Sequence, residues 1–211
     1  MSIYRDREEA GRLFADKLEQ YSGVGAIFAL PRGGVPIGAK IANRMGCPLD
    51  VLVVRKIGAP NQPELAIGAI ASGGVTLFND EILREFSGQQ DRIAAIIARE
   101  QAELRRRELK YRGQNKMYDV RGKTIVLTDD GAATGATMRA AIQAMRALNV
   151  ARVLVALPVC AGPAARMLTS EADELICLQI PDNFFAVGQW YRSFEQVTDA
   201  EVCALLANAS R

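Results

Sequence analysis

The sequence contains no histidine among its 211 residues. This absence excludes Ser-His-Asp and Cys-His triads, and it excludes every metal site that depends on imidazole ligands. Any chemistry must therefore use carboxylates, lysine and arginine, hydroxyl groups, backbone amides and a hydrated metal ion.

Cysteines are few and widely separated. The four thiols form no C-x-x-C pair, so we expect no zinc site and interpret them as small apolar core residues in a reducing compartment. The sequence has no N-terminal apolar run of signal-peptide length and no stretch near the roughly 20 apolar residues of a membrane span. These absences predict a cytoplasmic protein without a membrane partner.

A strong charge of either sign is also missing. The 26 lysines and arginines nearly balance the 24 aspartates and glutamates, which leaves a net charge of +2. No global field therefore points to a nucleic acid or a membrane surface. The length suits one α/β domain with a sizeable core, so we expect residues 1–211 to form a single domain.

Short apolar runs alternate with amphipathic segments along the chain. This alternation predicts a parallel sheet with helices on both faces. The expected strands are 24–30, 49–54, 124–130, 152–160 and 174–180, and the expected helices are 6–20, 35–46, 135–148, 163–172 and 198–208. Between about 57 and 120 we expect an insertion, with a hairpin around Gly73-Gly74 and a helical region over 80–112 that breaks near Ser87-Gly88.

The segment after the 124–130 strand has the features of a phosphate-binding loop. Its sequence is GAATGAT, and its small residues allow backbone N–H groups to close on an anion. The helix that follows adds the positive end of its dipole, and Thr134 and Thr137 can add hydroxyl donors. The Walker pattern G-x-x-x-x-G-K-[ST] is absent.

Two carboxylates, Asp129 and Asp130, precede this loop directly. They can accept hydrogen bonds from sugar hydroxyls or hold a hydrated magnesium ion through water. A ribose 5-phosphate offers both groups, a phosphate for the amides and a diol for the aspartates. The simpler alternative is that one of them is an ordinary helix cap.

Four segments, in chain order, resemble the type I phosphoribosyltransferases, which use phosphoribosyl diphosphate (PRPP). The specific signal is the acidic pair followed by T-G-x-T, and weaker matches are ALPRGG (29–34), VVRKIGAP (53–60) and PDNFFAVGQWY (181–191). The resemblance spans about residues 24–195 and extends to a group of bacterial members whose substrate is unsettled. It implies an α/β fold with a central parallel sheet flanked by helices and a small hood of C-terminal and N-terminal residues, at about 181–195.

The resemblance also implies roles for particular residues. Asp129 and Asp130 bind the ribose hydroxyls of PRPP and hold Mg²⁺ through water or those hydroxyls. The 5-phosphate is bound by Gly131, Ala132, Ala133, Thr134, Gly135, Ala136 and Thr137. The pyrophosphate is bound by Arg32, Gly33, Gly34, Arg55 and Lys56, and the base is covered by Phe184, Phe185, Trp190 and Tyr191. The alternative for this aromatic cluster is that two or three members only pack the hood.

The expected reaction displaces pyrophosphate from the ribose by a nitrogen nucleophile through a cation-like transition state. Enzymes specific for 6-oxopurines carry an aspartate where this loop has Ala133, so an adenine-like purine is favoured. A candidate for proton transfer is Glu64, which would act with Asp129, Asp130 and Lys56. The alternative is that Glu64 is an ordinary helix-start or surface carboxylate. The resemblance implies Mg²⁺ as cofactor, PRPP and a small nitrogenous acceptor as ligands, and a homodimer.

A second class of function stays open at this point. Some proteins with this fold bind PRPP as regulators that contact RNA or DNA. The stretch over 105–123 could form such a surface because clustered lysines and arginines attract phosphates. Against this, acidic residues interrupt the stretch and the net charge is near zero, so a nucleic-acid partner is not expected.

The acidic pair gives a direct prediction. Asp129→Asn combined with Asp130→Asn should abolish PRPP binding without unfolding the protein, because amides are poorer partners for sugar hydroxyls and magnesium than carboxylates. Calorimetric titration of PRPP in the presence of magnesium measures the effect. An unchanged PRPP affinity would show that the ribose role is wrong.

Overall fold

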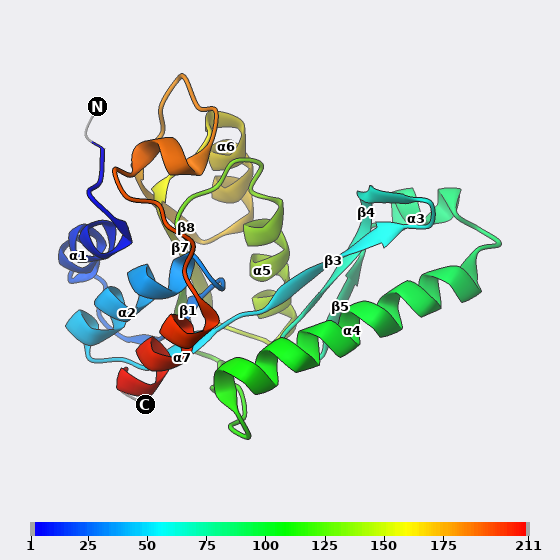
Figure 1. The fold of residues 1–211 in the computed structure, drawn as a ribbon, viewed down its shortest axis with the longest axis horizontal. Helices are drawn as coiled ribbons and strands as arrows, with labels where there is room; N and C mark the ends of the chain where they lie inside the picture. Colours follow the sequence, from blue (N-terminus) through cyan, green and yellow to red (C-terminus); the bar gives the residue numbers. More distant parts are fainter. Residues whose placement is uncertain (1–2, 210–211) are drawn as a thin grey trace.

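The computed structural model describes residues 3–209. Its centre is a five-stranded parallel sheet in the order β2-β1-β6-β7-β8 (Figure 1). The strands are β1 (Val24–Ala29), β2 (Leu49–Val51), β6 (Thr124–Thr128), β7 (Arg152–Val159) and β8 (Glu174–Gln179). The buried runs of β1, β6 and β7 are apolar except for Thr128 at the end of β6, as expected for a parallel sheet covered on both faces.

Helices cover both faces of this sheet, as the sequence predicts (Figure 1). One apolar cluster joins the sheet to α1 (Arg7–Leu18), α2 (Gly34–Met45) and α7 (Asp199–Asn208). A second cluster, on the opposite face, joins it to α5 (Ala136–Ala147) and α6 (Gly162–Glu171). The phosphoribosyltransferase-like α/β architecture expected from the sequence is therefore confirmed at the level of sheet and layers.

Residues 54–112 form an arm that projects from the parallel sheet (Figure 1). The arm contains an antiparallel sheet of β3 (Val54–Ala59), β4 (Gln62–Ala71) and β5 (Val75–Phe78), followed by α3 (Asp80–Glu85) and the long helix α4 (Gln90–Arg112). The predicted hairpin turn at Gly73-Gly74 and the helix break at Ser87-Gly88 are confirmed; all three glycines at 73, 74 and 88 have positive φ.

The expected strand over 49–54 is wrong in its extent. The chain leaves the parallel sheet after Val51 and enters β3 at Val54, so Arg55 and Lys56 lie inside an arm strand instead of following a strand of the central sheet. The connection is fixed by Ser72, whose hydroxyl accepts a hydrogen bond from the Val53 amide. The sequence does not show where the chain passes from one sheet to the other, because the apolar residues on either side of that point are buried in both sheets.

The segment over 181–195, called here the hood segment, pairs with the N-terminal residues. Tyr4 forms an isolated parallel bridge with Tyr191, and its amide donates to the Trp190 carbonyl. The hood segment includes the short 3-10 helix over Val187–Trp190. The N-terminal residues and the hood segment thus meet beside the carboxyl edge of the sheet, where the Asp130 backbone carbonyl accepts a hydrogen bond from Tyr191.

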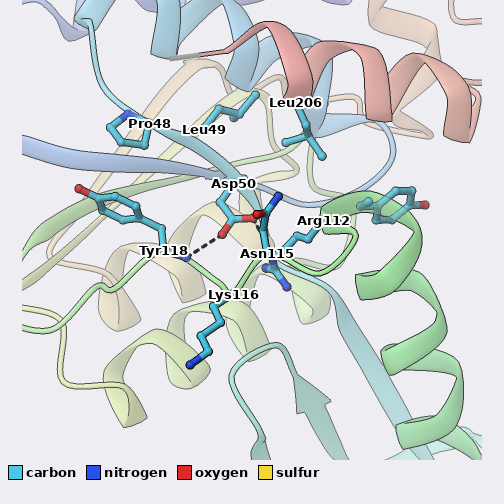
Figure 2. Close-up of a pocket in the computed structure, with 9 residues that line it drawn as sticks. Pro48, Leu49, Asp50, Arg112, Asn115, Lys116, Tyr118 and Leu206 are labelled. Carbon is cyan, nitrogen blue, oxygen red and sulfur yellow. Dashed lines mark hydrogen bonds and ion pairs between the residues drawn. The ribbon is translucent and has the colours of Figure 1, made fainter. Parts of the chain in front are cut away.

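A buried ion pair ties the base of the arm to the edge strand β2. Figure 2 shows the Asp50 carboxylate facing Arg112 and the backbone of Tyr118. Asp50 Oδ1 lies 2.7 Å from Arg112 Nε, and Oδ2 accepts from the Tyr118 amide at 3.0 Å. The Arg112 side chain is only 7% exposed, and it also donates to the Val51 carbonyl and to Glu108.

Asp50→Ala should therefore lower the free energy of unfolding by about 3 kcal/mol, because Arg112 keeps only Glu108 as a charged partner and the Tyr118 amide loses its acceptor. Urea denaturation followed by circular dichroism measures this loss.

Asp16→Ala serves as the control for this substitution. The Asp16 side chain is 70% exposed and lies 3.7 Å from Arg44, a contact worth about 0–1 kcal/mol. Equal effects of the two substitutions would contradict a structural role for the Asp50 pair.

Candidate active site

Two glycine-containing loops meet at the carboxyl ends of the neighbouring strands β1 and β6. The strands are in register at Ala29 and Thr128, and the Leu30 amide donates to the Thr128 carbonyl. A Cβ atom on Gly33 would lie 2.0 Å from Asp130 Oδ2, and one on Gly34 would lie 2.6 Å from the Thr128 carbonyl oxygen. Only glycine permits this approach, so the PRGG loop packs directly on the acidic pair.

Asp130 is fixed by two residues from distant parts of the chain, Arg7 and Tyr191. Arg7 Nε donates to Asp130 Oδ2 at 2.8 Å, and the two side chains are only 11% and 15% exposed. Tyr191 donates its hydroxyl proton to the Asp130 carbonyl at 2.6 Å. Arg7 in turn stacks on Phe194, with its guanidinium carbon 3.9 Å from the ring centroid. The carboxylate therefore has one cationic partner and a defined orientation.

Sequence reasoning missed Arg7. It lies in the first turn of an ordinary amphipathic helix, where a charged residue is typical of a solvated surface. Its partners are 123 and 188 positions away along the chain, at Asp130 and at the Glu195 carbonyl. No local spacing could reveal this contact.

The loop after the acidic pair presents small, mostly exposed residues at the start of α5. Ala132 is anchored beside β7, since its amide donates to the Val159 carbonyl. Ala133, Thr134, Ala136 and Thr137 lie on the exposed rim, and Gly135 turns the chain with a φ of 74°. The structure thus places all seven predicted loop residues around one helix N-terminus.

The distribution of acidic residues in the first turns of the helices is consistent with an anion-binding site at the carboxyl edge of the parallel sheet. The first turns of α2 and α5, which follow the two loops, contain no acidic residue. Acidic residues do occur in the first turns of α1, α3, α4 and α7, where they offset the helix dipole, whereas α6 also has none. The N-termini of α2 and α5 are left electropositive, as binding of a phosphate requires.

Burial shifts the protonation of both aspartates. Desolvation raises the pKa of Asp129 well above its usual value of 3.8, and the adjacent Asp130 charge raises it further. Desolvation also raises the pKa of Asp130, while the Arg7 guanidinium opposes this shift. No side chain of residues 3–209 forms a salt bridge with Asp129, whose Oδ1 accepts only the Asp130 amide. A cation or a diol bound there would relieve this uncompensated charge.

The donor set fits magnesium only when a ligand supplies further oxygens. Residues 3–209 contain no group of three or more Cys, Asp or Glu side chains that could hold a metal ion. Two adjacent carboxylates do suit Mg²⁺, which keeps several waters and is commonly bound through one or two carboxylates plus substrate phosphates.

The residues expected at the pyrophosphate fall into two separate places. Arg32, beyond the cis Pro31–Arg32 peptide bond, lines a cavity next to the last turns of α4. Arg55 and Lys56 line another cavity, of about 400 Å³, between β3 and α4. There Arg55 Nη2 lies 2.5 Å from the buried Glu100, and Lys56 pairs with Glu64 at 3.2 Å. The Glu64 side chain is 97% exposed, and its role in proton transfer stays a prediction.

The four hood aromatics differ in their environments. Trp190 and Tyr191 are buried, and Tyr191 packs between Tyr4 and Phe194. Phe184 is half-buried against the core, whereas Phe185 is 88% exposed. Among these four rings, only Phe185 offers most of its surface to a ligand.

The chain is similar to known proteins in sequence and in fold. The family described as "Phosphoribosyl transferase domain" matches residues 3–193. A crystal structure of TT1426 from Thermus thermophilus covers 100% of both chains with 38% sequence identity and a TM-score of 0.89. The chain therefore belongs to the phosphoribosyltransferase family, as the resemblance of the acidic pair and loop predicts.

Two Mycobacterium tuberculosis proteins, from strains CDC 1551 / Oshkosh and H37Rv, are 42% identical to the chain over 212 residues. Both are named "Putative phosphoribosyl transferase". The alignments cover 100% of this chain and 48% of theirs, so the chain spans about half the length of these curated relatives. Within residues 3–209, none of the helices has both the length and the apolar character needed to cross a membrane.

Asp129→Asn should stabilise the protein at pH 7 when neither metal nor PRPP is present. Because folding raises the pKa of Asp129, its ionised form destabilises the native state above that pKa, and an amide removes the penalty. The gain should vanish as the pH falls towards 3.8, where the wild-type carboxyl is itself protonated. Scanning calorimetry in EDTA at pH 7 and near pH 4 measures both limits.

Asp182→Asn, in an exposed position of the hood segment, is the matched control and should leave the melting temperature unchanged at both pH values. A lower melting temperature for Asp129→Asn at pH 7 would contradict the assigned burial penalty.

Proposed function

We propose that the protein is a magnesium-dependent phosphoribosyltransferase that uses PRPP to ribosylate a nitrogen nucleophile, with an adenine-like purine favoured. The observation that carries this proposal is the packing of the PRGG loop on the Asp129-Asp130 pair, beside the small-residue start of α5. One edge thereby offers carboxylates for a diol and two uncompensated helix N-termini for phosphates. Family membership supports the same reaction class.

In this proposal each part of the edge contacts one part of PRPP. Asp129 and the free oxygen of Asp130 accept hydrogen bonds from the ribose hydroxyls, and the amides of Gly131 to Thr137 bind the 5-phosphate. Arg32, Gly33 and Gly34 bind the diphosphate from the side of α2. Magnesium, held by the carboxylates and PRPP oxygens, would supply positive charge to the leaving group.

The reaction exchanges one bond at C1 of the ribose. The nucleophile's lone pair forms the C–N bond as the C–O bond to diphosphate breaks, and the bonding electrons leave with pyrophosphate. The chain's contribution is to orient the two substrates and to stabilise the developing anion with fixed donors. Ala133 cannot accept the nucleophile's proton, which leaves Glu64 on the arm or solvent for that step.

The exposed ring of Phe185 is the proposed stacking surface for the base, while Trp190 and Tyr191 support the hood from within. The proposal also includes a single domain carrying the arm as an insertion, in a cytoplasmic homodimer, as the family resemblance implies.

The alternative of a nucleic-acid-binding regulator gains no support from the basic stretch. Of its eight cations, five have carboxylate partners within residues 3–209 and one lies on an aromatic ring. Arg106 and Arg107 pair with Glu103, Lys110 with Asp199, Arg112 with Asp50, and Arg121 with Asp119, while Lys123 lies over Tyr118. A surface with so much internal neutralisation attracts nucleic-acid phosphates weakly.

A pyrophosphate-release assay tests the proposed function. With PRPP and magnesium, adenine should release pyrophosphate faster than hypoxanthine, guanine, uracil or ammonia, because the loop carries no acceptor suited to 6-oxopurines. The Asp129→Asn/Asp130→Asn variant sets the background and should lose at least about 100-fold in rate, since it lacks electrostatic contacts to the transition state. If no acceptor exceeds that background, the protein is not a transferase of this kind.

A further inference from the structure

A further cavity, of about 270 Å³, lies beside β2, the strand at the outer edge of the parallel sheet. Its walls come from β2, from the end of α4 with the loop after it, and from α7 (Figure 2). None of its lining residues belongs to the PRGG loop, the acidic pair, the small-residue loop or the hood segment. A molecule bound in this cavity would therefore leave the proposed PRPP site open.

The two buried charges in the lining are already paired within the chain. The Asp50 carboxylate accepts hydrogen bonds from Arg112 Nε and from the Tyr118 amide. Arg112 also pairs with Glu108, so neither charge requires a counterion from outside. The choice of ligand therefore depends on the other groups that line the cavity.

The backbone of β2 offers a hydrogen-bond donor and an acceptor at the cavity. The Pro48 carbonyl and the Leu52 amide form hydrogen bonds with β1. Val51 faces the other way, and side chains bind both its amide and its carbonyl. Leu49 alternates with the inward residues, so its N–H and C=O also point outward, where no strand of residues 3–209 pairs with β2. A donor next to an acceptor is the pattern that the edge of a nucleobase complements.

Asn115 and Lys116 add polar side chains that are free to bind a ligand. Both residues are exposed, and neither side chain has a hydrogen-bond or ion-pair partner among residues 3–209. Most other cations of the stretch over 105–123 are paired with carboxylates, whereas Lys116 can bind an anion without breaking an ion pair. The Asn115 amide suits adenine, which asparagine can bind through two hydrogen bonds.

Apolar and aromatic groups complete the walls of the cavity. Pro48 and Leu206 contribute aliphatic surface, and Tyr118 contributes a half-buried ring. Lys123 Nζ lies 4.1 Å from the centroid of that ring and covers one of its faces. The other face can pack against a planar ring, as bases do on aromatic side chains. A flat heterocycle that carries an anionic group therefore matches the lining.

We propose that this cavity binds a nucleoside monophosphate at a second site, separate from the PRPP edge. The base packs against Tyr118 and Leu206, and its edge bonds to the Leu49 backbone and the Asn115 amide. The phosphate reaches Lys116. The inference goes beyond the proposed function and does not require it, because the two sites share no residue.

Calorimetric titration with AMP, at saturating ribose 5-phosphate and magnesium, is the test. Ribose 5-phosphate occupies the small-residue loop, so AMP that still binds must occupy another site. One AMP per chain should remain bound under these conditions. AMP that ribose 5-phosphate displaces completely lies at the PRPP edge, and that result would overturn the inference, as would a wild type that binds no AMP.

Lys116→Gln should weaken this AMP binding about tenfold, as expected for the loss of one charge-assisted contact. Arg105→Gln is the matched control and should leave the affinity unchanged. Arg105 is likewise a cation of the stretch over 105–123 without a carboxylate partner among residues 3–209, yet it does not line the cavity. An equal loss for both variants would indicate general attraction by the basic stretch and would contradict a site in the cavity.

The base is tested by changes in the apolar walls. Tyr118→Leu removes the stacking surface, and Leu206→Trp fills the cavity from α7, so each should weaken AMP binding at least about tenfold. Asn115→Ala should remove a preference of about tenfold for AMP over UMP. Melting temperatures identify any variant that fails to fold. Unchanged AMP affinity in folded Tyr118→Leu or folded Leu206→Trp protein would overturn the assignment.

The same measurements separate this inference from the proposed function. PRPP binding that requires Asp129 and Asp130, in a protein whose AMP affinity ignores the cavity variants, overturns the cavity assignment and leaves the function standing. AMP binding that follows the cavity variants, in a protein that neither binds PRPP nor releases pyrophosphate from it, supports the cavity and overturns the function.

Discussion

The contact between the Asp130 carboxylate and Arg7 is the interaction on which the candidate site depends. Two adjacent carboxylates at a buried strand end repel each other and lose hydration, so they require compensation. Arg7 provides it for one of them, and Gly33 allows the neighbouring loop to close over the same oxygen. Tyr191 fixes the backbone beneath. The other carboxylate, Asp129, has no salt-bridge partner among residues 3–209, which leaves its side chain available to a ligand.

Much of the fold follows from local sequence, because buried parallel strands and amphipathic helices have distinct periods. The apolar runs of β1, β6 and β7 and the glycines that end α2 and break the helical region of the arm are visible without coordinates. The phosphate-binding loop can be predicted from composition instead, because a run of small residues follows two adjacent aspartates.

Long-range contacts are what the sequence does not reveal. Arg7 has the pattern of a surface residue, and Arg55 follows an apolar run that continues through a change of sheet. Trp190 and Tyr191 are aromatic, which predicts that they stack on the base, yet both are buried against the N-terminal segment. In each case the deciding partner is tens of residues away, and only the folded chain brings the two together. The roles of individual site residues therefore stay predictions for binding measurements.

The N-terminal residues and the hood segment meet beside Asp130, and this has a consequence for when the site is completed during synthesis. During synthesis the acidic pair emerges after Arg7, but Tyr191 and Phe194 emerge some 60 residues later (191 − 130 = 61). Until then the nascent sheet holds two crowded carboxylates without the ring that supports Arg7 or the hydroxyl that fixes Asp130. The candidate site is thus complete only once the chain has been made as far as Phe194, after the residues of the parallel sheet and the arm.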